Sequence, residues 1–557
     1  MKNRHRSTDL VHGVARQTRY KTTSSFFKKS KSLNTLPLYS TQSKLAILFT
    51  LSIATIFSGS KAFAQSNQSV PDAVVAQAEI TQRRLRSPVF EGQQVRQEAV
   101  VPAGNNEAIA DIEVVYVDED GNLTEGKTNP EVITREFAFQ PGDNYNAELA
   151  KEGLQGVLDL KIIERASLTL EPVAEDRAVM TVAVRESSNI SVGFGLTLPP
   201  PTALQGPVKP FTVNALSDSA TGIGGGIQVG LLNIGGDNQE VDLGIEGGEQ
   251  NFGFNLGYRK FFRHDRGIGV NFFASRGVEP EFDESDRDID LPDGDDPWVH
   301  RLGGGVEYFL PIGEDFQSAV GVSYQRITVK DDAFSDNIEP RDELGNRLTV
   351  NEDGDDLLTL NFAAVLDRRN NTRNPTQGYK LEFGSDQYFP VGEAEIVSNR
   401  LAANYTHYLP LPLFGFSEGA KTLILNFQGG TILGDALPYD AFILGGSSSV
   451  RGYDTSEIST SRSFIQASAE YRYPITNLNI FNNDLDVGGT LFIDYANDLG
   501  SADAVIGQPA VVRDRPGDGL GYGLGLRTLT PIGAVRTEFA LNDDGDAEFI
   551  FTVGDRF

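Results

Sequence analysis

The chain has 557 residues, more than one soluble core usually organises, so several parts are expected. It contains no cysteine, which excludes a disulfide framework, a thiolate metal site and an acylated cysteine anchor. The formal net charge of -29 at pH 7 argues against nucleic acid or anionic lipid as a partner.

The first part of the chain has the pattern of an export signal. An apolar run over 45–57 follows Lys44 and precedes Ala62-Phe63-Ala64, where small residues suit signal peptidase. The run is shorter than the roughly 20 residues that a membrane helix needs. Residues 1–64 are therefore interpreted as a signal peptide with an extended basic n-region. A start codon further downstream and an organelle transit peptide are the alternatives.

A linker and a small mixed domain are expected next. Residues 65–106 show no sustained hydrophobic period and are interpreted as a flexible linker. In 107–187, apolar residues first alternate as in a strand, and Asn129-Pro130 then gives a helix start. A second helix is expected near Asn146, and two strands follow. The order β-α-α-β-β predicts a small α+β domain.

From 188 to 557 the pattern is that of a transmembrane β-barrel. Period-two segments of about ten residues recur, separated by Gly, Asp, Asn and Pro turns. In 485–495 one face is apolar, whereas the other carries Asp486 and Asp494 at mid-strand. Such charges suit a polar lumen opposite a lipid-facing surface. About sixteen segments are found, an even number that predicts an all-β barrel of about 16 antiparallel strands.

The end of the chain resembles a terminal barrel strand. Phe549, Phe551, Val553 and Phe557 fall on one face of a period-two segment, and the chain stops on an aromatic residue. This pattern is typical of the terminal-strand signal that barrel-assembly machinery recognises. An ordinary edge strand is the alternative.

A second motif lies in a long connection between two expected strands. Its residues Val450, Arg451, Gly452 and Tyr453 resemble the sixth-loop signature of the BamA and TamA family, which includes two-partner secretion transporters and the chloroplast Toc channel. In that family the loop folds into the barrel and its Arg meets an Asp in a Phe-x-Asp-x-Gly motif.

The matching segment here is Phe492-Ile-Asp494-Tyr-Ala496, in which Ala replaces the final Gly. Asp494 falls on the polar face of its strand, and an Arg inserted into a pore needs a carboxylate partner. We therefore expect a contact between Arg451 and Asp494. A solvated loop cation is the alternative for Arg451.

Further segments resemble the same family. Residues 367–379 resemble its central strand-turn-strand segment, 519–533 its late hairpin, and 107–187 its periplasmic POTRA module. Only one such module is evident. The alternating glycines Gly519, Gly521, Gly523 and Gly525 do not have dinucleotide-loop spacing and are interpreted as small residues that thin the lumen wall.

The sequence offers no enzyme chemistry. After removal of the leader, His264, His300 and His407 remain, with no nucleophile or metal cluster around them. The acidic stretches 283–296 and 352–356 lack EF-hand spacing and are interpreted as solvated loops. No cofactor and no metal are expected.

Two functions from different classes follow. The resemblance implies a protein of the outer membrane, with its N-terminal domain in the periplasm, that inserts β-barrel proteins or translocates polypeptides. The implied partners are unfolded outer-membrane or secreted polypeptides, outer-membrane lipid and accessory assembly proteins. A seam between 191–198 and 549–557 would open toward lipid. The alternative is a passive, porin-like channel with a structural POTRA module; a surface adhesin has no specific residue in its favour.

Overall fold

The computed structural model describes residues 99–557 apart from 105, 175, 196–223, 249, 283–287, 313–315, 372–373, 393–394, 481–482, 531–532 and 554. The predicted signal peptide and most of the predicted linker lie outside the described residues. No helix among the described residues combines the length and apolarity needed to cross a membrane.

Residues 99–186 form a small α+β domain. Its sheet has the order β2-β1-β4-β3, with β1 parallel to β4 and the other pairs antiparallel. The predicted β-α-α-β-β order is confirmed, with a two-residue strand added after the first one. The elements are β1 (Ala108–Val117), β2 (Leu123–Thr124), α3 (Pro130–Thr134), α4 (Ala147–Asp159), β3 (Ile163–Ala174) and β4 (Arg177–Glu186).

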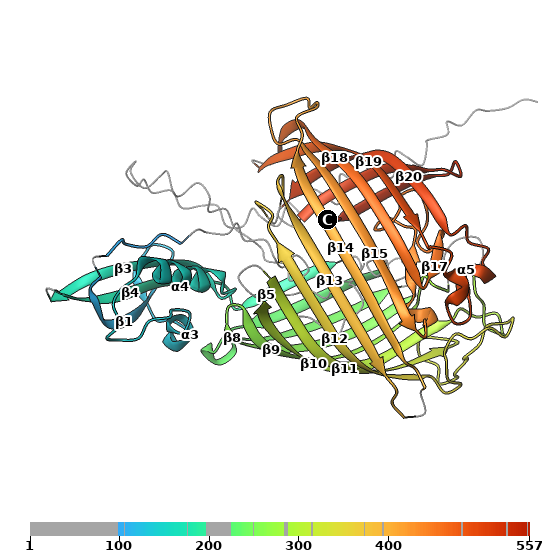
Figure 1. Ribbon diagram of the computed structural model, residues 1–557, viewed down its shortest axis with the longest axis horizontal. Helices are drawn as coiled ribbons and strands as arrows, with labels where there is room; N and C mark the ends of the chain where they lie inside the picture. Colours follow the sequence, from blue (N-terminus) through green and yellow to red (C-terminus); the bar gives the residue numbers. More distant parts are fainter. Residues whose placement is uncertain are drawn as a thin grey trace, which may run out of the picture. The chain divides into compact units, whose positions relative to one another are not determined.

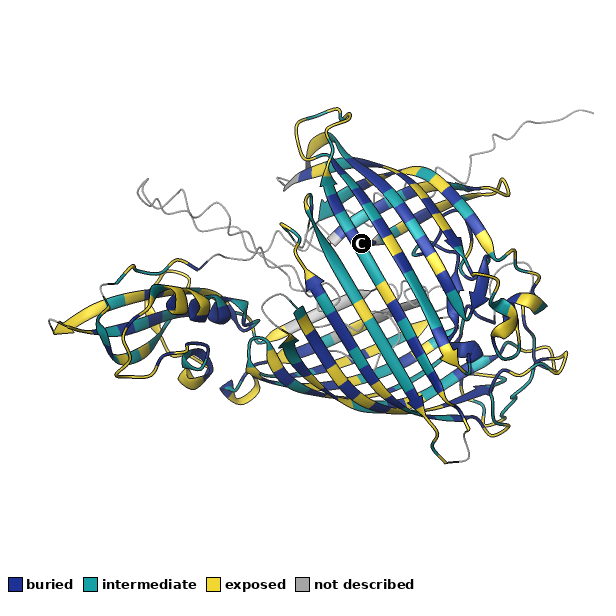
Figure 2. Ribbon diagram, viewed as in Figure 1, coloured by how far each residue is buried: buried dark blue, intermediate teal, exposed yellow. Residues whose placement is uncertain are grey.

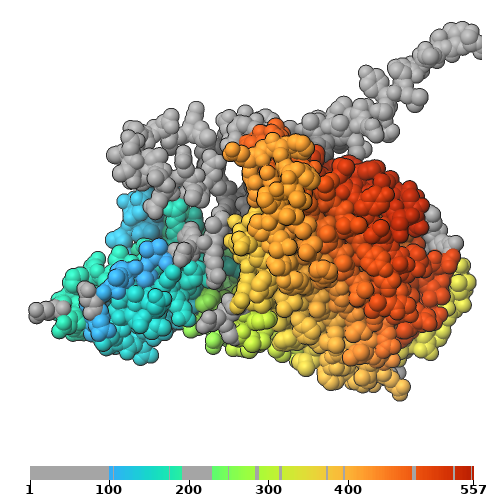
Figure 3. Space-filling view, turned by 45° about the horizontal axis from the view of Figure 1, so that its top comes forward, coloured from blue at the N-terminus to red at the C-terminus, as the bar shows by residue number. Residues whose placement is uncertain are grey.

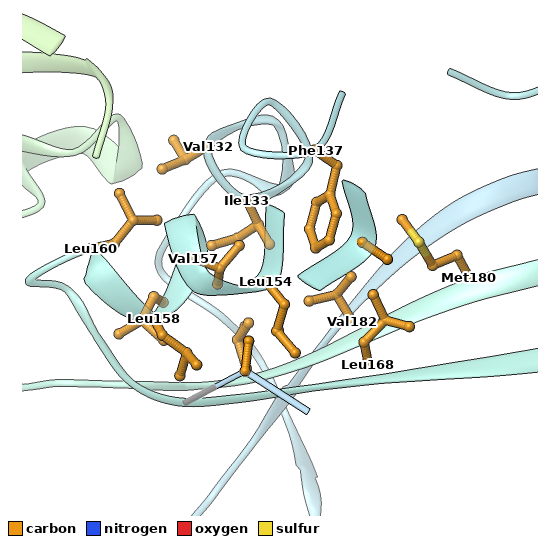
Figure 4. Packing of buried hydrophobic residues seen from close by; sticks show 14 of the residues in the cluster. Val132, Ile133, Phe137, Leu154, Val157, Leu158, Leu160, Leu168, Met180 and Val182 are labelled. Atoms are coloured by element: carbon orange, nitrogen blue, oxygen red, sulfur yellow. The ribbon is translucent and has the colours of Figure 1, made fainter. Parts of the chain in front are cut away.

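The helices of this domain start where the sequence indicates. The Asn146 side chain accepts hydrogen bonds from the backbone N–H groups of Glu148 and Leu149 and so caps α4. Buried residues of both helices pack on one face of the sheet, and Ile133, Leu154 and Met180 are members of this core (Figure 4). Ala99 also belongs to this core, so packed residues begin ahead of the boundary expected at residue 107.

The rest of the described chain forms one antiparallel sheet of 16 strands (Figure 1). The predicted barrel and its strand number are therefore confirmed. The strands are β5 (Ile190–Gly195), β6 (Gly224–Leu232), β7 (Gln239–Gly248), β8 (Asn251–Arg263), β9 (Arg266–Val278), β10 (Trp298–Ile312), β11 (Phe316–Lys330), β12 (Asp355–Asp367), β13 (Gly378–Phe389), β14 (Ser398–Pro410), β15 (Thr422–Gly434), β18 (Ser463–Ile480), β19 (Asn483–Asn497), β20 (Asp518–Thr530), β21 (Gly533–Asn542) and β22 (Ala547–Val553).

Side chains alternate between two environments along the barrel strands. On β20, Tyr522, Leu524 and Leu526 are exposed, while the glycines between them face inward (Figure 2). On β18, Gln466, Ser468, Glu470 and Arg472 are buried, and Ile465 is exposed. An apolar outer surface and a polar interior are the arrangement expected of a barrel in lipid.

The connections between strands differ in length on the two ends of the barrel. Because strands alternate in direction, every second connection lies at the end where β5 follows the α+β domain. The connections at the opposite end include two long ones. One, over 435–462, carries the short strands β16 (Phe442–Leu444) and β17 (Ser459–Ser461); the other, over 498–517, carries the short helix α5 (Pro509–Val512).

Candidate functional site inside the barrel

The 435–462 connection folds back into the barrel. β16 pairs with β17, and Phe442, Val450, Tyr453 and Phe464 form part of a buried apolar cluster. This cluster holds the connection as a packed unit rather than a solvated loop. At its tip the chain carries Arg451, whose side chain is fully buried.

Arg451 contacts three carboxylates from three strands. Its Nε and Nη2 donate to the two oxygens of Asp494 on β19, at 2.7 and 3.0 Å. Its Nη1 donates to Glu470 on β18 at 2.8 Å and to Glu538 on β21 at 2.7 Å. Such charge-assisted bonds are the strong ones, and the fork to Asp494 fixes the orientation of the guanidinium. The loop tip is thus tied to the lumen wall.

The Arg451 guanidinium also contacts an aromatic ring. The Arg451 Cζ lies 3.4 Å from the centroid of the Phe492 ring, in cation–π geometry. Phe492 is itself buried against Ala540 and Ile550. Phe492 and Asp494, both singled out from the sequence, therefore act on the same side chain from two directions.

The residues on either side of Arg451 are also fixed. Gly452 has φ +100°, a backbone conformation that favours glycine, and its N–H donates to Glu548 on β22 at 3.1 Å. The Tyr453 hydroxyl donates to Asp543, in the connection that leads into β22. The motif thereby contacts the last strand of the sheet.

The glycine stripe of β20 makes room for this motif. A Cβ on Gly521 would lie 1.9 Å from the Arg451 carbonyl oxygen, and one on Gly523 would lie 2.5 Å from the Phe492 ring. A Cβ on Gly519 would lie 2.8 Å from the Tyr453 ring. The inference that these glycines thin the lumen wall therefore has a specific reason: Gly521 admits the backbone of the inserted loop, Gly519 admits the Tyr453 ring, and Gly523 admits the Phe492 ring.

Each of the three carboxylates has a second cation. Glu470 accepts from Arg472 at 2.7 Å, Glu538 lies 3.5 Å from Arg536, and Asp494 accepts from Arg556 at 2.8 Å. Sharing in this way offsets the cost of burying charges, which is high for an unpaired ion.

The end of the chain departs from the expected terminal strand. β22 ends at Val553, so Phe557 does not continue the face that bears Phe549 and Phe551. Asp555 instead accepts two hydrogen bonds from Arg527 of β20, at 2.9 and 2.7 Å. Arg556 is buried between Asp494 and the Ser449 carbonyl, to which it also donates. The C-terminal tail, residues 555–557, thus turns into the lumen.

Phe549 and Phe551 lie on the outer surface, 62% and 45% exposed.

No cluster of metal-ligating side chains is found in the described part of the chain. Sequence reasoning did not identify Glu538 or Arg556 as members of the site. The signal that could have marked Glu470 is its charge in the middle of a strand whose alternate residues are apolar.

The first and last strands of the sheet are short. β5 pairs with β6 and β22 with β21, but within the described residues no pairing joins β5 to β22. β5 and β22 thus stand at the two ends of the strand order, and these are the strands between which the sequence predicts a seam.

Comparison with known proteins gives a consistent result. The chain is 27% identical over 455 residues to Outer envelope protein 80, chloroplastic, of Arabidopsis thaliana, covering 80% of this chain and 57% of that one. It is 26% identical over 487 residues to Protein TOC75, chloroplastic, of Pisum sativum, covering 81% and 56%. The chain thus spans a little over half the length of these relatives.

Among solved structures, BamA from Haemophilus ducreyi lacking POTRA domains 1–3 is similar with a TM-score of 0.55, at 16% identity over 81% of this chain and 85% of that one. CdiB from Escherichia coli is similar with a TM-score of 0.51, at 12% identity over 80% and 74%. These likenesses concern the fold. Residues 233–557 match the Omp85 superfamily domain, and the chain belongs to the Omp85 superfamily.

Proposed function

We propose that this protein inserts β-barrel proteins into an outer membrane or moves polypeptides across it. The observation that carries the proposal is the buried Arg451, which ties a long connection to three carboxylates inside the lumen. A barrel filled by a packed loop of its own is poorly suited to free diffusion of solutes. The alternative, a passive channel, requires that this loop leave the lumen open.

The seam supports a lateral route for the client. An unpaired sheet edge cannot remain exposed to hydrocarbon without cost, because its N–H and C=O groups lack partners. β5 and β22 would satisfy these groups either with each other or with a strand of the client. The motif loop reaches β22 through the Gly452–Glu548 hydrogen bond, so loop position and seam position are mechanically connected.

The α+β domain offers a second place for an extended client. β3 lies at the edge of its sheet and, within the described residues, pairs only with β4. A client strand added to this edge would use main-chain hydrogen bonds, which tolerate many sequences. We propose that this domain is a POTRA-type module in the periplasm and that unfolded barrel or secreted polypeptides, with accessory assembly proteins, are the partners.

Depletion of the protein, with outer-membrane proteins and secreted proteins quantified, tests the proposal. We expect the levels of barrel proteins, or of secreted proteins, to fall. Unchanged levels of both would refute the proposed function.

Conductance in planar bilayers separates assembly from passive transport. We expect low conductance for the parent protein and higher conductance for Arg451→Ala, because the loop is then less firmly held in the lumen. High solute flux through the parent, without any binding of an unfolded barrel polypeptide, would favour the passive channel.

A further inference from the structure

The connection between β14 and β15 departs from the short turns expected at its end of the barrel. It covers residues 411–421, here called the rim turn, and lies at the end where β5 follows the α+β domain. Leu413, Phe414 and Phe416 are 66%, 43% and 76% exposed. Such exposure of large apolar side chains in one short segment calls for a partner.

The rim turn is folded outward against the barrel wall. Tyr471 has the same strand parity as the exposed Ile465 of β18, so it points away from the lumen. Its hydroxyl accepts from the backbone N–H groups of Leu413 and Phe414, both at 3.2 Å, and lies 2.9 Å from the Phe414 carbonyl. The Phe416 N–H donates to the Pro474 carbonyl at 2.9 Å. These bonds fix the turn on the outer face.

Aromatic rings continue from the wall into the turn. The Phe414 ring lies 4.9 Å from the rings of Tyr471 and Tyr473, and the Phe416 ring lies 6.0 Å from that of Tyr473. Tyr471 is only 7% exposed because the turn covers it. The free faces of Phe416 and Leu413 are thus held away from the lumen by a rigid support.

We propose that the rim turn is a membrane-interface anchor that binds the boundary between phospholipid headgroups and acyl chains. The patch is continuous with the apolar outer wall, where Phe427 of β15 and Ile465 of β18 are 52% and 49% exposed. These strands share one uninterrupted outer surface (Figure 3, orange to red). Aromatic rings beside polar groups favour this boundary, and Glu418 and Lys421 flank the rings with charge.

The geometry favours lipid over a protein partner. The exposed side chains of Leu413 and Phe416 are apolar, and the hydroxyl of Tyr471 is already satisfied by the turn itself. The anchor would fix the β14–β18 wall in the leaflet next to the α+β domain. That wall is separated from the β5–β22 seam by four strands on the shorter side, β19 to β22.

A single-tryptophan experiment on the full chain tests the anchor. Trp298 is the only tryptophan, so Trp298→Phe with Phe416→Trp gives one reporter at the rim turn. The protein is reconstituted in phosphatidylcholine vesicles carrying bromine at shallow or at deep acyl positions. We expect shallow bromines to quench about half of the emission, and deep bromines distinctly less.

Two control tryptophans show the quenching expected inside and outside the membrane. Phe427→Trp on the lipid-facing wall should be quenched by the deep bromines, whereas Leu123→Trp, at an exposed site of the α+β domain, should not be quenched. Folding of each variant is checked by the shift of the unheated band on denaturing gels. A reporter at position 416 that behaves like the one at position 123 would overturn the proposal and leave a protein partner as the explanation.

A second variant tests how the anchor is held. Tyr471→Phe keeps the ring but removes the hydroxyl that binds the backbone of the rim turn. We expect the quenching of the tryptophan reporter at position 416 by shallow bromines to fall by about half, while the barrel stays folded. Unchanged quenching would show that the hydroxyl does not position the anchor, contrary to the proposed geometry.

Discussion

Replacing Arg451 with alanine should release the 435–462 connection from the barrel lumen. The substitution removes two hydrogen bonds to Asp494, one to Glu470 and one to Glu538. Breaking a buried ion pair from one side generally costs about 3–5 kcal/mol. Because each of the three carboxylates keeps a second arginine nearby, the lower value, about 3 kcal/mol, applies here.

The expected loss of free energy can be converted into the fraction of molecules in which the 435–462 connection is undocked. At about 1.4 kcal/mol for each factor of ten, a loss of about 3 kcal/mol raises the undocked fraction of the loop by about a hundredfold. Arg451→Lys should fall between the parent and Arg451→Ala, because it keeps the charge and loses the fork to Asp494.

Thiol labelling measures this fraction directly. The chain has no cysteine, so Ser449→Cys provides a unique thiol two residues before Arg451, at a site that is 1% exposed. The labelling rate by a maleimide should rise about a hundredfold when Arg451→Ala is added. The control is Arg341→Ala, which removes an exposed ion pair with Glu352 that contributes about 0–1 kcal/mol.

Equal labelling of the parent and the Arg451→Ala protein, both folded, would refute the reasoning. It would mean that packing of the apolar cluster, rather than the ion pairs, holds the loop. An equally large rise in the Arg341→Ala control would show that the assay reports general loosening of the barrel.

Three further predictions concern the glycines of β20, the C-terminal tail and the 279–297 connection. Gly521→Ala should increase labelling of the loop thiol, since its Cβ would meet a loop carbonyl, whereas Gly247→Ala, with nothing within 4 Å, should not; the same maleimide assay decides. Asp555→Asn should weaken the ion pairs that hold the C-terminal tail in the lumen, so that maleimide labels a thiol at Phe557→Cys faster. An unchanged labelling rate would show that these ion pairs do not hold the tail. Glu281 lies in an outer connection, where burial and, secondly, a neighbouring glutamate raise its pKa to about 8. Between pH about 4.5 and about 8, the Glu281 carboxyl is therefore neutral in the folded protein but charged in the unfolded chain. The packed state of this connection loses stability as the pH rises through that range. Limited proteolysis of 279–297 should accelerate over that range in the parent but not in Glu281→Gln; identical pH profiles would contradict the assignment.

The barrel could be predicted from sequence because each strand carries its own period-two signal. The sixteen strands are neighbours in chain order, so their number could be counted without knowing which distant segments pair. The parity of Asp494 likewise indicated which way its side chain points. Local periodicity thus sufficed for the fold and for one member of the site.

The other members depended on geometry that one strand cannot show. Glu470 and Glu538 lie on β18 and β21, and their approach to one guanidinium depends on the stagger of strands that are not neighbours. The turn of Asp555 and Arg556 into the lumen was also hidden, because the alternating pattern up to Phe557 suits a longer strand equally well. The tail could continue β22 or turn into the lumen, and the positions of Arg472 and Arg527, which pair with Asp555, decide between the two conformations.

Client folding in vesicles with the seam locked tests the central proposal most directly. Paired cysteines scanned along β5 and β22 in this cysteine-free chain would give a crosslink that can be reversed by reductant. We expect the parent protein to accelerate folding of an unfolded barrel client into the vesicles, the crosslink to abolish the acceleration, and reduction to restore it. Acceleration that persists with the seam locked, or solute flux with no acceleration at all, would contradict the account.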